Sequence, residues 1–283
     1  MNVFPKWLLP AVVLLLIIPG SCRKESDSAK VFSSSEDEYL AALELVNEKQ
    51  KNIYFQHLPG REENRLVREM NDERLHLAVL HASTSPTALS TVTNSCDLIP
   101  RQDVKAVYDA LNPGMKKTNL GKAIKKHVDN KTVLVGDLLP HFEGVGLDGK
   151  PFDWSVTAGK RVLLIYEGWG WIKRSTHFWF KDLLAATDRD SLAVVTYVYA
   201  DSMADLRKRV KSFQLDPYLV ISDLKGKEGP LDKRMGIRGI PTYYYTDRQG
   251  RIRCIIAGFD EHLFTYYTGL SPKWGENWTD DND

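Results

Sequence analysis

The stretch that decides the fold runs from Arg161 to Arg174 and reads RVLLIY, then EG, then WGWIKR. Its first six residues form an aliphatic run closed by Tyr166, a pattern typical of a strand that is buried on both faces. From about Ser175 to Thr187 the apolar residues recur with helical spacing. The sequence therefore predicts a buried strand, a short loop with two tryptophans, and a helix.

Outward from this stretch, strands and helices alternate from about residue 132 to residue 270. Such alternation predicts an α/β layer fold. Turn residues separate the last two strands, and Gly269 is a suitable stop for the final helix. Besides 161–166, the predicted strands are 192–199, 218–222, 243–246 and 252–256, and the predicted helices include 203–213 and 260–268.

A second informative element, Gly239-Ile240-Pro241-Thr242, follows the tryptophan loop by about 70 residues and leads into a strand. The order and spacing resemble the TlpA/ResA-like thioredoxin-fold lipoproteins of the AhpC/TSA–thioredoxin-like superfamily, of the type found in Bacteroidota. The resemblance covers residues 132–270. It implies a thioredoxin-like domain with a central mixed sheet flanked by helices, and a cis peptide bond between Ile240 and Pro241.

Family members carry two redox cysteines, and both are absent here. The degenerate CxxC positions are Gly170 and Lys173, and a shift of one residue places Trp171 and Arg174 there instead. Neither alignment supplies a thiol nucleophile or a resolving thiol. We therefore expect no catalytic residue at this site. Nearby Ile165 replaces a polar group of the family, and we interpret Glu167 as structural or solvent-facing.

What the motif retains favours binding. The resemblance assigns to the residue before the proline, Ile240, backbone hydrogen bonds to an extended peptide. We predict a non-catalytic protein- or peptide-binding module for a partner in the cell envelope, and the predicted binding residues are Trp169, Trp171, Arg174, Ile240 and Pro241. Trp169 and Trp171 could form an exposed aromatic surface, to which Phe178 and Trp179 could add, although helical spacing favours the core for the latter two. Lys173 and Arg174 could either bind an anion at the helix start or extend into solvent, and we favour solvent.

The chain has three cysteines, Cys22, Cys96 and Cys254. A Cys96–Cys254 disulfide is one possibility, and two separate, largely buried side chains is the one we favour. An alternative function is residual thiol-disulfide oxidoreductase activity that uses Cys254 or Cys96.

The N-terminus predicts a lipoprotein. Residues 1–21 contain Lys6 and an apolar run too short for a transmembrane helix, and they end before Cys22, the predicted lipidation site. Residues 22–36 read as a flexible tether. We predict a lipid-anchored, periplasm-facing location in the cell envelope, and we favour the outer membrane over the inner. Removal of residues 1–21 deletes Lys6 alone among charged residues, so the net charge falls from +1 to 0, which gives no electrostatic case for nucleic acid.

Residues 37–131 predict an α-helical N-terminal region. Leu66, Met70, Leu77 and Leu80 are spaced to share one helix face, and Ser85 precedes Pro86 as a helix cap. This region suggests a third function, a structural or assembly component that acts through its helices. Residues 271–283 form an acidic tail.

Two patterns of other functions are present but incomplete. Gly144 to Gly149 fits a dinucleotide fingerprint, yet Asp148-Gly149 predicts a hairpin turn and no helix start follows it. His76 and His81 are five residues apart and point to different helix faces. We therefore predict no cofactor and no metal.

Overall fold

The computed structural model describes residues 34–272, apart from residues 57, 59, 229 and 238. The predicted signal peptide and the predicted lipidation at Cys22 lie outside the described residues, as do most of the tether and of the acidic tail. The last three tether residues already belong to helix α1, which begins at Ser34. The predicted division of the chain near residues 131 and 132 stays a prediction.

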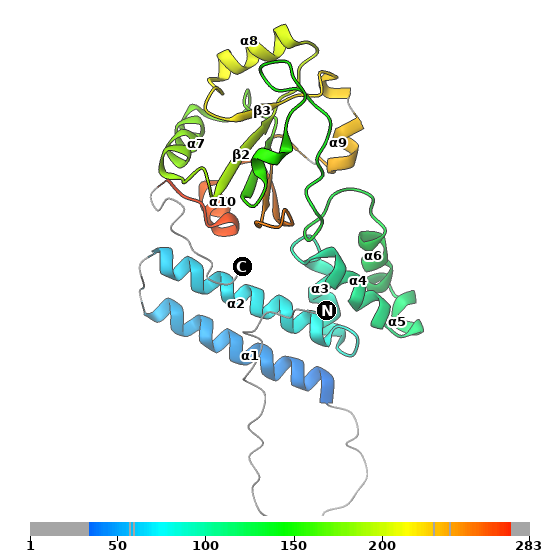
Figure 1. Cartoon of the computed structure of the whole chain (residues 1–283). Coiled ribbons are helices and arrows are strands. Elements are labelled where there is room, and N and C mark those ends of the chain that lie inside the picture. The colour runs from blue at the N-terminus through cyan, green and yellow to red at the C-terminus, as the bar shows by residue number, and fades with distance from the viewer. Residues whose placement is uncertain (1–33, 57, 59, 229, 238, 273–283) are drawn as a thin grey trace, which may run out of the picture. The chain divides into compact units, whose positions relative to one another are not determined.

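The N-terminal part of the described chain is helical, as predicted. The helices α1 and α2 form an antiparallel pair (Figure 1), and the shorter helices cover a small core whose buried members include Tyr39, Leu89, Val104 and Ile124. Leu80, predicted to share a buried face, is instead 60% exposed. The six helices are α1 (Ser34–Phe55), α2 (Gly60–His81), α3 (Pro86–Asn94), α4 (Arg101–Ala110), α5 (Pro113–Lys117) and α6 (Asn119–Val128).

Side-chain caps fix where the short helices begin. Ser85 Oγ accepts a hydrogen bond from the Ala88 N–H at 3.0 Å, so it caps α3 as the sequence predicts. Asn112 Oδ1 accepts one from the Met115 N–H at 2.9 Å. Asn112 therefore caps α5, and Pro113 suits the first helical position that follows it.

The C-terminal part holds a five-stranded mixed sheet in the order β3-β2-β1-β4-β5. β1 is parallel to β2, β2 is parallel to β3, and β4 is antiparallel to both β1 and β5. The strands are β1 (Arg161–Tyr166), β2 (Leu192–Tyr197), β3 (Leu219–Ile221), β4 (Thr242–Thr246) and β5 (Ile252–Ala257). The predicted α/β class and the predicted positions of all five strands are confirmed.

Helices cover both faces of this sheet (Figure 1). The helices are α7 (Arg174–Ala186), α8 (Met203–Phe213), α9 (Pro230–Met235) and α10 (Glu261–Thr268), with short 3-10 helices η2 (Trp154–Thr157) and η3 (Gly226–Glu228). The sequence did not predict α9. Gly269 ends α10 with a φ of +70°, as its position predicts.

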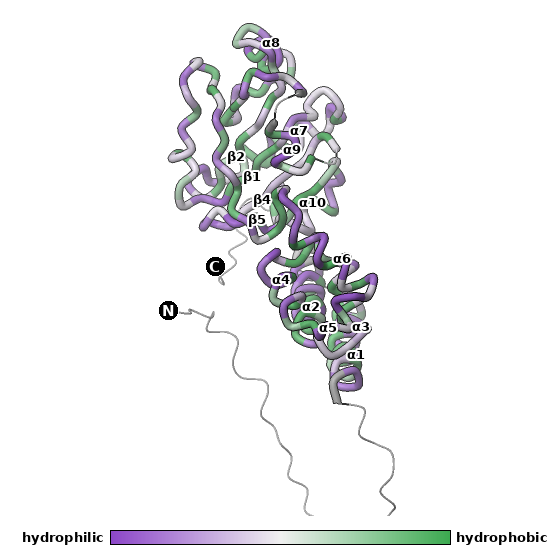
Figure 2. Tube along the Cα trace, turned by 90° about the vertical axis from the view of Figure 1, so that its right-hand side faces the viewer, coloured by the Kyte–Doolittle hydropathy of each residue, from purple (hydrophilic) through white to green (hydrophobic). Residues whose placement is uncertain are grey.

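Strand β1 lies at the centre of the sheet, and its side chains belong to two hydrophobic cores. Leu163 and Ile165 point to a core shared with α7, α8 and α10. Leu164 and Tyr166 point to the opposite core, beside η2 and α9. Alternate side chains of a strand face opposite ways, so burial on both faces requires the continuous apolar run that the sequence has. Figure 2 shows this concentration of hydrophobic residues on the strands.

Asp232 fastens α9 to the sheet. Its carboxylate accepts hydrogen bonds from the hydroxyls of Tyr166 on β1, at 2.5 Å, and of Tyr199 just after β2, at 2.7 Å. The Tyr244 hydroxyl on β4 donates to the Met235 carbonyl at the end of α9, also at 2.7 Å. Three neighbouring strands therefore hold one short helix.

The glycine-rich stretch before η2 makes no helix, as predicted. Val145 bridges to Pro151 and to Ser222, and Gly149 has a φ of +80° in the turn between the first pair. In this part of the described chain the next element is the 3-10 helix η2. Within these described residues, no α-helix N-terminus therefore follows the turn to receive a phosphate.

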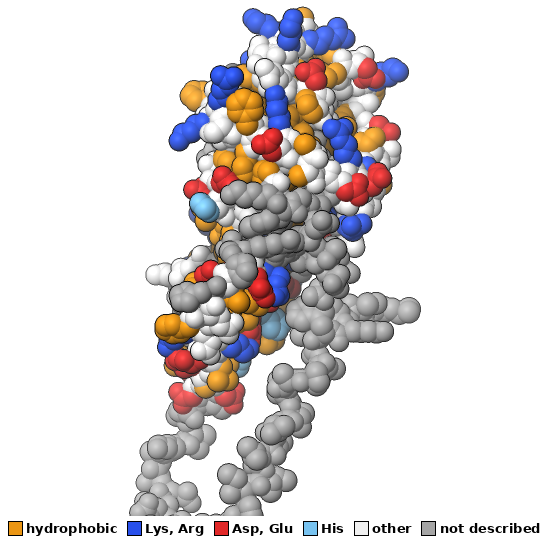
Figure 3. Space-filling model, turned by 90° about the vertical axis from the view of Figure 1, so that its left-hand side faces the viewer, with side chains coloured by type: hydrophobic (Ala, Val, Ile, Leu, Met, Phe, Trp, Pro, Cys, Tyr) orange, Lys and Arg blue, Asp and Glu red, His pale blue; other side chains and the backbone are white. Residues whose placement is uncertain are grey.

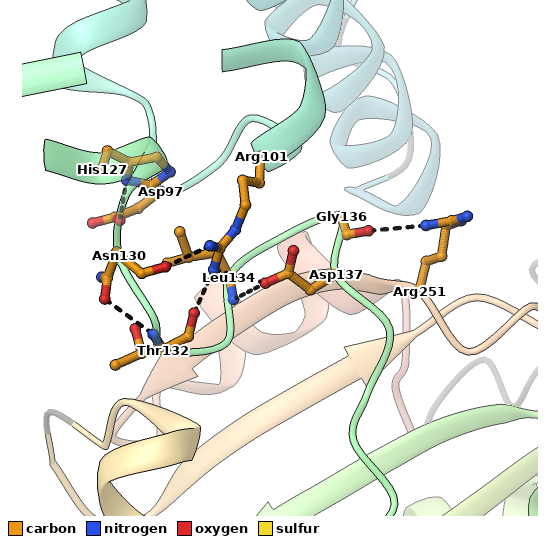
Figure 4. A network of polar contacts seen from close by, with 9 residues as sticks. All are labelled: Asp97, Arg101, His127, Asn130, Thr132, Leu134, Gly136, Asp137 and Arg251. Atoms are coloured by element: carbon orange, nitrogen blue, oxygen red, sulfur yellow. Dashed lines mark hydrogen bonds and ion pairs between the residues drawn. The ribbon is translucent and has the colours of Figure 1, made fainter. Parts of the chain in front are cut away.

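Polar contacts join the helical part to the sheet part (Figure 4). The Arg101 guanidinium, at the start of α4, forms an ion pair with Asp137 at 2.8 Å and donates to the carbonyls of Asn130 and Thr132. Arg251 donates to the Gly136 carbonyl at 3.3 Å. The linker between the two parts is thus bound from both sides. Among the described residues, the helices are all too short or too polar to cross a bilayer.

Candidate functional site

The loop after β1 turns sharply to reach α7. Glu167 and Gly168 have φ values of +54° and +96°, and the Gly168 carbonyl accepts from the N–H groups of Trp171 at 2.8 Å and Ile172 at 3.2 Å. Lys173 is the N-cap residue of α7, with no cap hydrogen bond from its side chain, and Arg174 is the first helical residue. The motif thus occupies a strand-to-helix turn, as the sequence predicts.

Gly168 brings this loop against Pro241. A Cβ atom on Gly168 would lie 2.5–2.6 Å from the backbone nitrogen, Cα and Cβ of Pro241, so only glycine allows the approach. Pro241 is buried and Ile240 is half-buried. The Ile240–Pro241 bond is cis, as the resemblance implies. The two sequence elements about 70 residues apart therefore meet.

Trp169 lies inside the protein, which corrects the expectation that it forms part of an exposed surface. Its side chain is 2% exposed, and the indole N–H donates to Thr196 Oγ1 on β2 at 2.6 Å. The ring packs against Phe180 and Tyr218. Trp169 thus anchors the loop to the sheet, and a partner cannot contact its ring.

Trp171 is exposed instead, together with part of α7. Its exposed fraction is 74%, and Phe178 is 50% exposed although its helical spacing favours the core. The Arg174 guanidinium lies 5.4 Å from the centre of the Phe178 ring, a cation–π contact. Trp179, by contrast, is buried as predicted. We refer to Trp171, Arg174 and Phe178 as the Trp171 surface.

The former cysteine positions face solvent without any thiol. Gly170 and Lys173 are both exposed. The Arg174 guanidinium at the helix start lies over the Phe178 ring. The preference for solvent over an anion site stays a prediction.

The cysteines of the described chain lie elsewhere. Neither Cys96 nor Cys254 is in a disulfide, and the two belong to different hydrophobic clusters. Cys254 lies on β5, and burial raises the pKa of its thiol to about 12. A thiol with so high a pKa is protonated at neutral pH and is a poor nucleophile.

Glu167 is a structural group of the loop. It is 5% exposed, and its carboxylate accepts a hydrogen bond from the Tyr199 N–H at 2.7 Å. Burial raises the pKa of this carboxyl, against the opposing effect of the backbone hydrogen bonds. The residue lies beyond the end of β1 in a left-handed conformation, so it holds the turn against the end of β2.

One titratable group at the site was not predicted. His177, in the first turn of α7, donates from Nε2 to the Trp169 carbonyl at 3.0 Å, and its ring lies beside the Trp169 ring. Burial lowers the pKa of this imidazole, with Lys181 adding to the effect. Its only sequence signal is its place one turn after Lys173. The hydrogen bond from His177 to the Trp169 carbonyl fixes the buried end of the loop that carries Trp171.

These features define the class of fold. A mixed sheet with a helix-starting motif after its central strand, packed against a proline at the start of the adjacent antiparallel strand, is a thioredoxin-like fold, as the sequence resemblance implies. It is the fold of thiol-disulfide oxidoreductases, and in this chain it is preceded by a helical region.

Comparison with known proteins gives similarity in structure only. No family model matches the sequence, and no curated protein matches it. The thioredoxin domain of a thiol-disulfide oxidoreductase from Bacteroides vulgatus is 18% identical, with a TM-score of 0.41, over 50% of this chain and 100% of that one. A thiol-disulfide isomerase from Corynebacterium glutamicum is 16% identical, with a TM-score of 0.40, over 47% and 94%. An exposed lipoprotein thioredoxin from Streptococcus pneumoniae is 27% identical, with a TM-score of 0.35, over 44% and 96%.

Proposed function

We propose that this chain is a thioredoxin-like lipoprotein of the cell envelope that has lost redox chemistry and binds an extended segment of a partner protein. The contact site consists of the Trp171 surface together with Ile240 and Pro241, against which Gly168 of the same loop packs. The observation that carries the proposal is the content of the strand-to-helix turn. Between Gly170 and Lys173, the exposed positions at which the resemblance places the redox cysteines, this chain presents the Trp171 indole, which is 74% exposed.

The chemistry of the Trp171 surface supports a protein partner. Trp and Arg are enriched among the residues that contribute most binding energy at protein interfaces, and Phe is enriched in interfaces as well. Without a partner, the apolar surface of two large aromatic side chains stays in contact with water. A bound partner that covers this surface gains about 25 cal/mol for each Å² removed from water. The buried Trp169, whose indole N–H donates to Thr196, anchors the loop that carries Trp171, which lowers the entropy cost of binding.

The setting of the turn supports an extended ligand. The resemblance assigns backbone hydrogen bonding to Ile240, which is half-buried next to the loop. Backbone pairing with an extended segment supplies affinity, and side-chain contacts supply specificity. Trp171 and Phe178 would provide the side-chain contacts.

Site-specific cross-linking tests this proposal in the native envelope. A photoreactive phenylalanine analogue replaces Trp171 in the full chain, and a matched control carries it at Phe55, which is 78% exposed on α1. We expect a discrete cross-linked partner from position 171 that is absent from position 55 and is lost in Phe178→Ala. Identical products from both positions, or none, would reject the site.

The affinity of that partner for each variant then measures how much the substituted side chain contributes to binding. Loss of a central aromatic contact typically costs 1–2 kcal/mol or more, so Trp171→Ala and Phe178→Ala should each weaken binding about 5- to 30-fold. Phe55→Ala should leave it unchanged. An unchanged affinity for both site variants would place the partner elsewhere.

Residual redox activity is the alternative that depends on Cys254 or Cys96. The high pKa of the buried Cys254 thiol counts against it. An insulin-reduction assay with dithiothreitol compares wild type with Cys254→Ala and Cys96→Ser. We expect all three at the uncatalysed rate, whereas a cysteine-dependent rate above background would establish the alternative.

A role for the helical part is favoured by its own exposed apolar groups. Leu45 and Phe55 on α1 are 67% and 78% exposed, and Leu80 on α2 is 60% exposed. Figure 3 shows hydrophobic side chains among charged ones on one face of the chain. Cross-links from position 55 in the experiment above, with none from position 171, would favour this role.

The proposed location is tested through Cys22. Radiolabelled palmitate should be incorporated into wild type and not into Cys22→Ser, and the wild type should fractionate with outer-membrane vesicles. Recovery of unlabelled wild type in the soluble periplasmic fraction would contradict the lipid anchor.

A further inference from the structure

Three metal-ligating side chains converge in the helical part, away from the thioredoxin-like site. They are Cys96, Asp97 and His127, and one ligand atom of each lies within 4.8 Å of the other two. His127 Nδ1 lies 3.6 Å from Asp97 Oδ1 (Figure 4). The sequence spacing hides this group, because 30 residues separate Asp97 from His127.

The fold holds the three groups at fixed positions. Cys96 and Asp97 lie in the turn between α3 and α4, directly after the C-cap residue Ser95. His127 lies in the last turn of α6. Both segments pack on the same core, which contains Val92 of α3 and Ile124 of α6. The ligand atoms are therefore brought together by packing that exists without a metal.

Burial is graded across the group. The His127 side chain is 7% exposed, Cys96 is half-buried, and the Asp97 side chain is 53% exposed. The buried imidazole lies at the inner end of the group, and the exposed carboxylate lies at the outer end, which an ion arriving from solvent would reach first. In a tetrahedral site with bonds of 2.0–2.3 Å, ligand atoms lie roughly 3.3–3.6 Å apart. His127 Nδ1 and Asp97 Oδ1, at 3.6 Å, already have that spacing, and the three ligand atoms together lie within 4.8 Å of one another.

The donor set indicates the class of metal. One thiolate sulfur, one imidazole nitrogen and one carboxylate oxygen suit Zn²⁺ and similar borderline ions, whereas Ca²⁺ and Mg²⁺ require oxygen ligands. The Cys96 thiolate and the Asp97 carboxylate would together neutralise the charge of a divalent ion. Three protein ligands leave a fourth position for water or another donor, as in sites that exchange ligands.

We infer that Cys96, Asp97 and His127 form a binding site for a borderline divalent metal ion, with Zn²⁺ as the favoured ion. The site is independent of the proposed partner-binding surface. The inference differs from the expectation, drawn from histidine spacing, that the chain binds no metal. The competing interpretation is an Asp97–His127 ion pair that stabilises the C-terminus of α6, with Cys96 beside it.

Zn²⁺ titration of the full chain tests the inference. A background of Cys22→Ser and Cys254→Ala leaves Cys96 as the single thiol, and a chromophoric chelator competes for the Zn²⁺. We expect one ion per chain. Cys96→Ser and Asp97→Asn should each weaken binding by more than the 10- to 100-fold that loss of an outer-shell partner costs. Mg²⁺ should not compete.

A matched control separates coordination from charge. Asp129→Asn also removes one negative charge near the end of α6, but Asp129 is 58% exposed and pairs with Lys125. Its Zn²⁺ affinity should equal that of the background chain. Equal effects of Asp97→Asn and Asp129→Asn would reduce the result to surface electrostatics and overturn the site.

Two further readouts do not depend on affinity. Co²⁺ should give a thiolate-to-metal charge-transfer band that is absent in Cys96→Ser, and Zn²⁺ should slow alkylation of Cys96 by iodoacetamide. Asp97 is exposed, so Asp97→Asn tests the site even if a substitution of the buried His127 disturbs folding. An absence of saturable Zn²⁺ binding, or of the charge-transfer band, would leave the ion-pair interpretation.

Discussion

Replacement of Gly168 by alanine tests whether contact between the loop and the proline holds the site together. The new Cβ atom would lie 2.5–2.6 Å from three atoms of Pro241, all of them backbone or ring atoms that cannot rotate away. Atoms at such distances must separate by about half an ångström or more. Either the loop after β1 or the segment before β4 has to move.

The expected cost has two parts. The φ of +96° is unfavourable for any residue with a Cβ, by roughly 1–2 kcal/mol. The steric overlap with a packed neighbour adds about 1–3 kcal/mol, the range for overpacked cores. Gly168→Ala should therefore lower the free energy of unfolding by about 2–5 kcal/mol.

Gly250→Ala measures the cost of a positive φ without the steric overlap. Gly250 has a φ of +76° in the turn before β5, and a Cβ there would meet no atom within 4 Å. Urea unfolding of both variants, followed by circular dichroism, gives each free energy, and equal m-values ensure that the same transition is compared. Gly168→Ala should be less stable than Gly250→Ala by at least about 1 kcal/mol. Equal losses would show that the contact with Pro241 is not close, and the reasoning would fail.

Three other predictions concern buried groups of the thioredoxin-like part of the chain. Thr196→Val removes the acceptor of the buried Trp169 indole N–H and should cost about 1–3 kcal/mol in urea unfolding, whereas Thr196→Ser should cost less. Burial raises the pKa of Glu167 in the folded protein. The stability that its protonated carboxyl contributes is therefore lost as pH rises above the unfolded pKa of 4.5. Glu167→Gln should therefore gain stability relative to wild type between pH 4 and pH 7, and a pH-independent difference would contradict this. Cys254 should resist Ellman's reagent until the protein is unfolded. The double variant Cys22→Ser, Cys96→Ser leaves Cys254 as the single thiol, and fast labelling of the folded double variant would contradict this prediction.

The fold could be predicted because its signals are local and repeated. Continuous apolar runs mark strands that are buried on both faces, and each is bounded by turn residues. The placement of Pro241 against the loop follows from the order of the two motifs along the chain. Helix α9 escaped prediction because its six residues are fewer than two turns, so no periodicity can emerge.

The exposed and buried aromatic residues of the site could not be told apart from the sequence. Trp169 and Trp171 lie in a loop where neither the period of a strand nor that of a helix applies. The left-handed conformations of Glu167 and Gly168 decide that Trp169 turns inward to Thr196. Likewise, the pairing of Asp97 with His127 arises from the packing of α3 against α6, which no spacing rule contains.

The hydrogen bonds of Asp232 join α9 to two neighbouring strands of the sheet through a single side chain. One carboxylate accepts from Tyr166, which directly precedes the loop, and from Tyr199, which follows β2. A displacement of α9 would break both bonds together, leaving two phenols and a carboxylate unpaired at once. A shift of α9 away from the sheet therefore costs two hydrogen bonds at once, at about 1–3 kcal/mol for each buried group left unsatisfied.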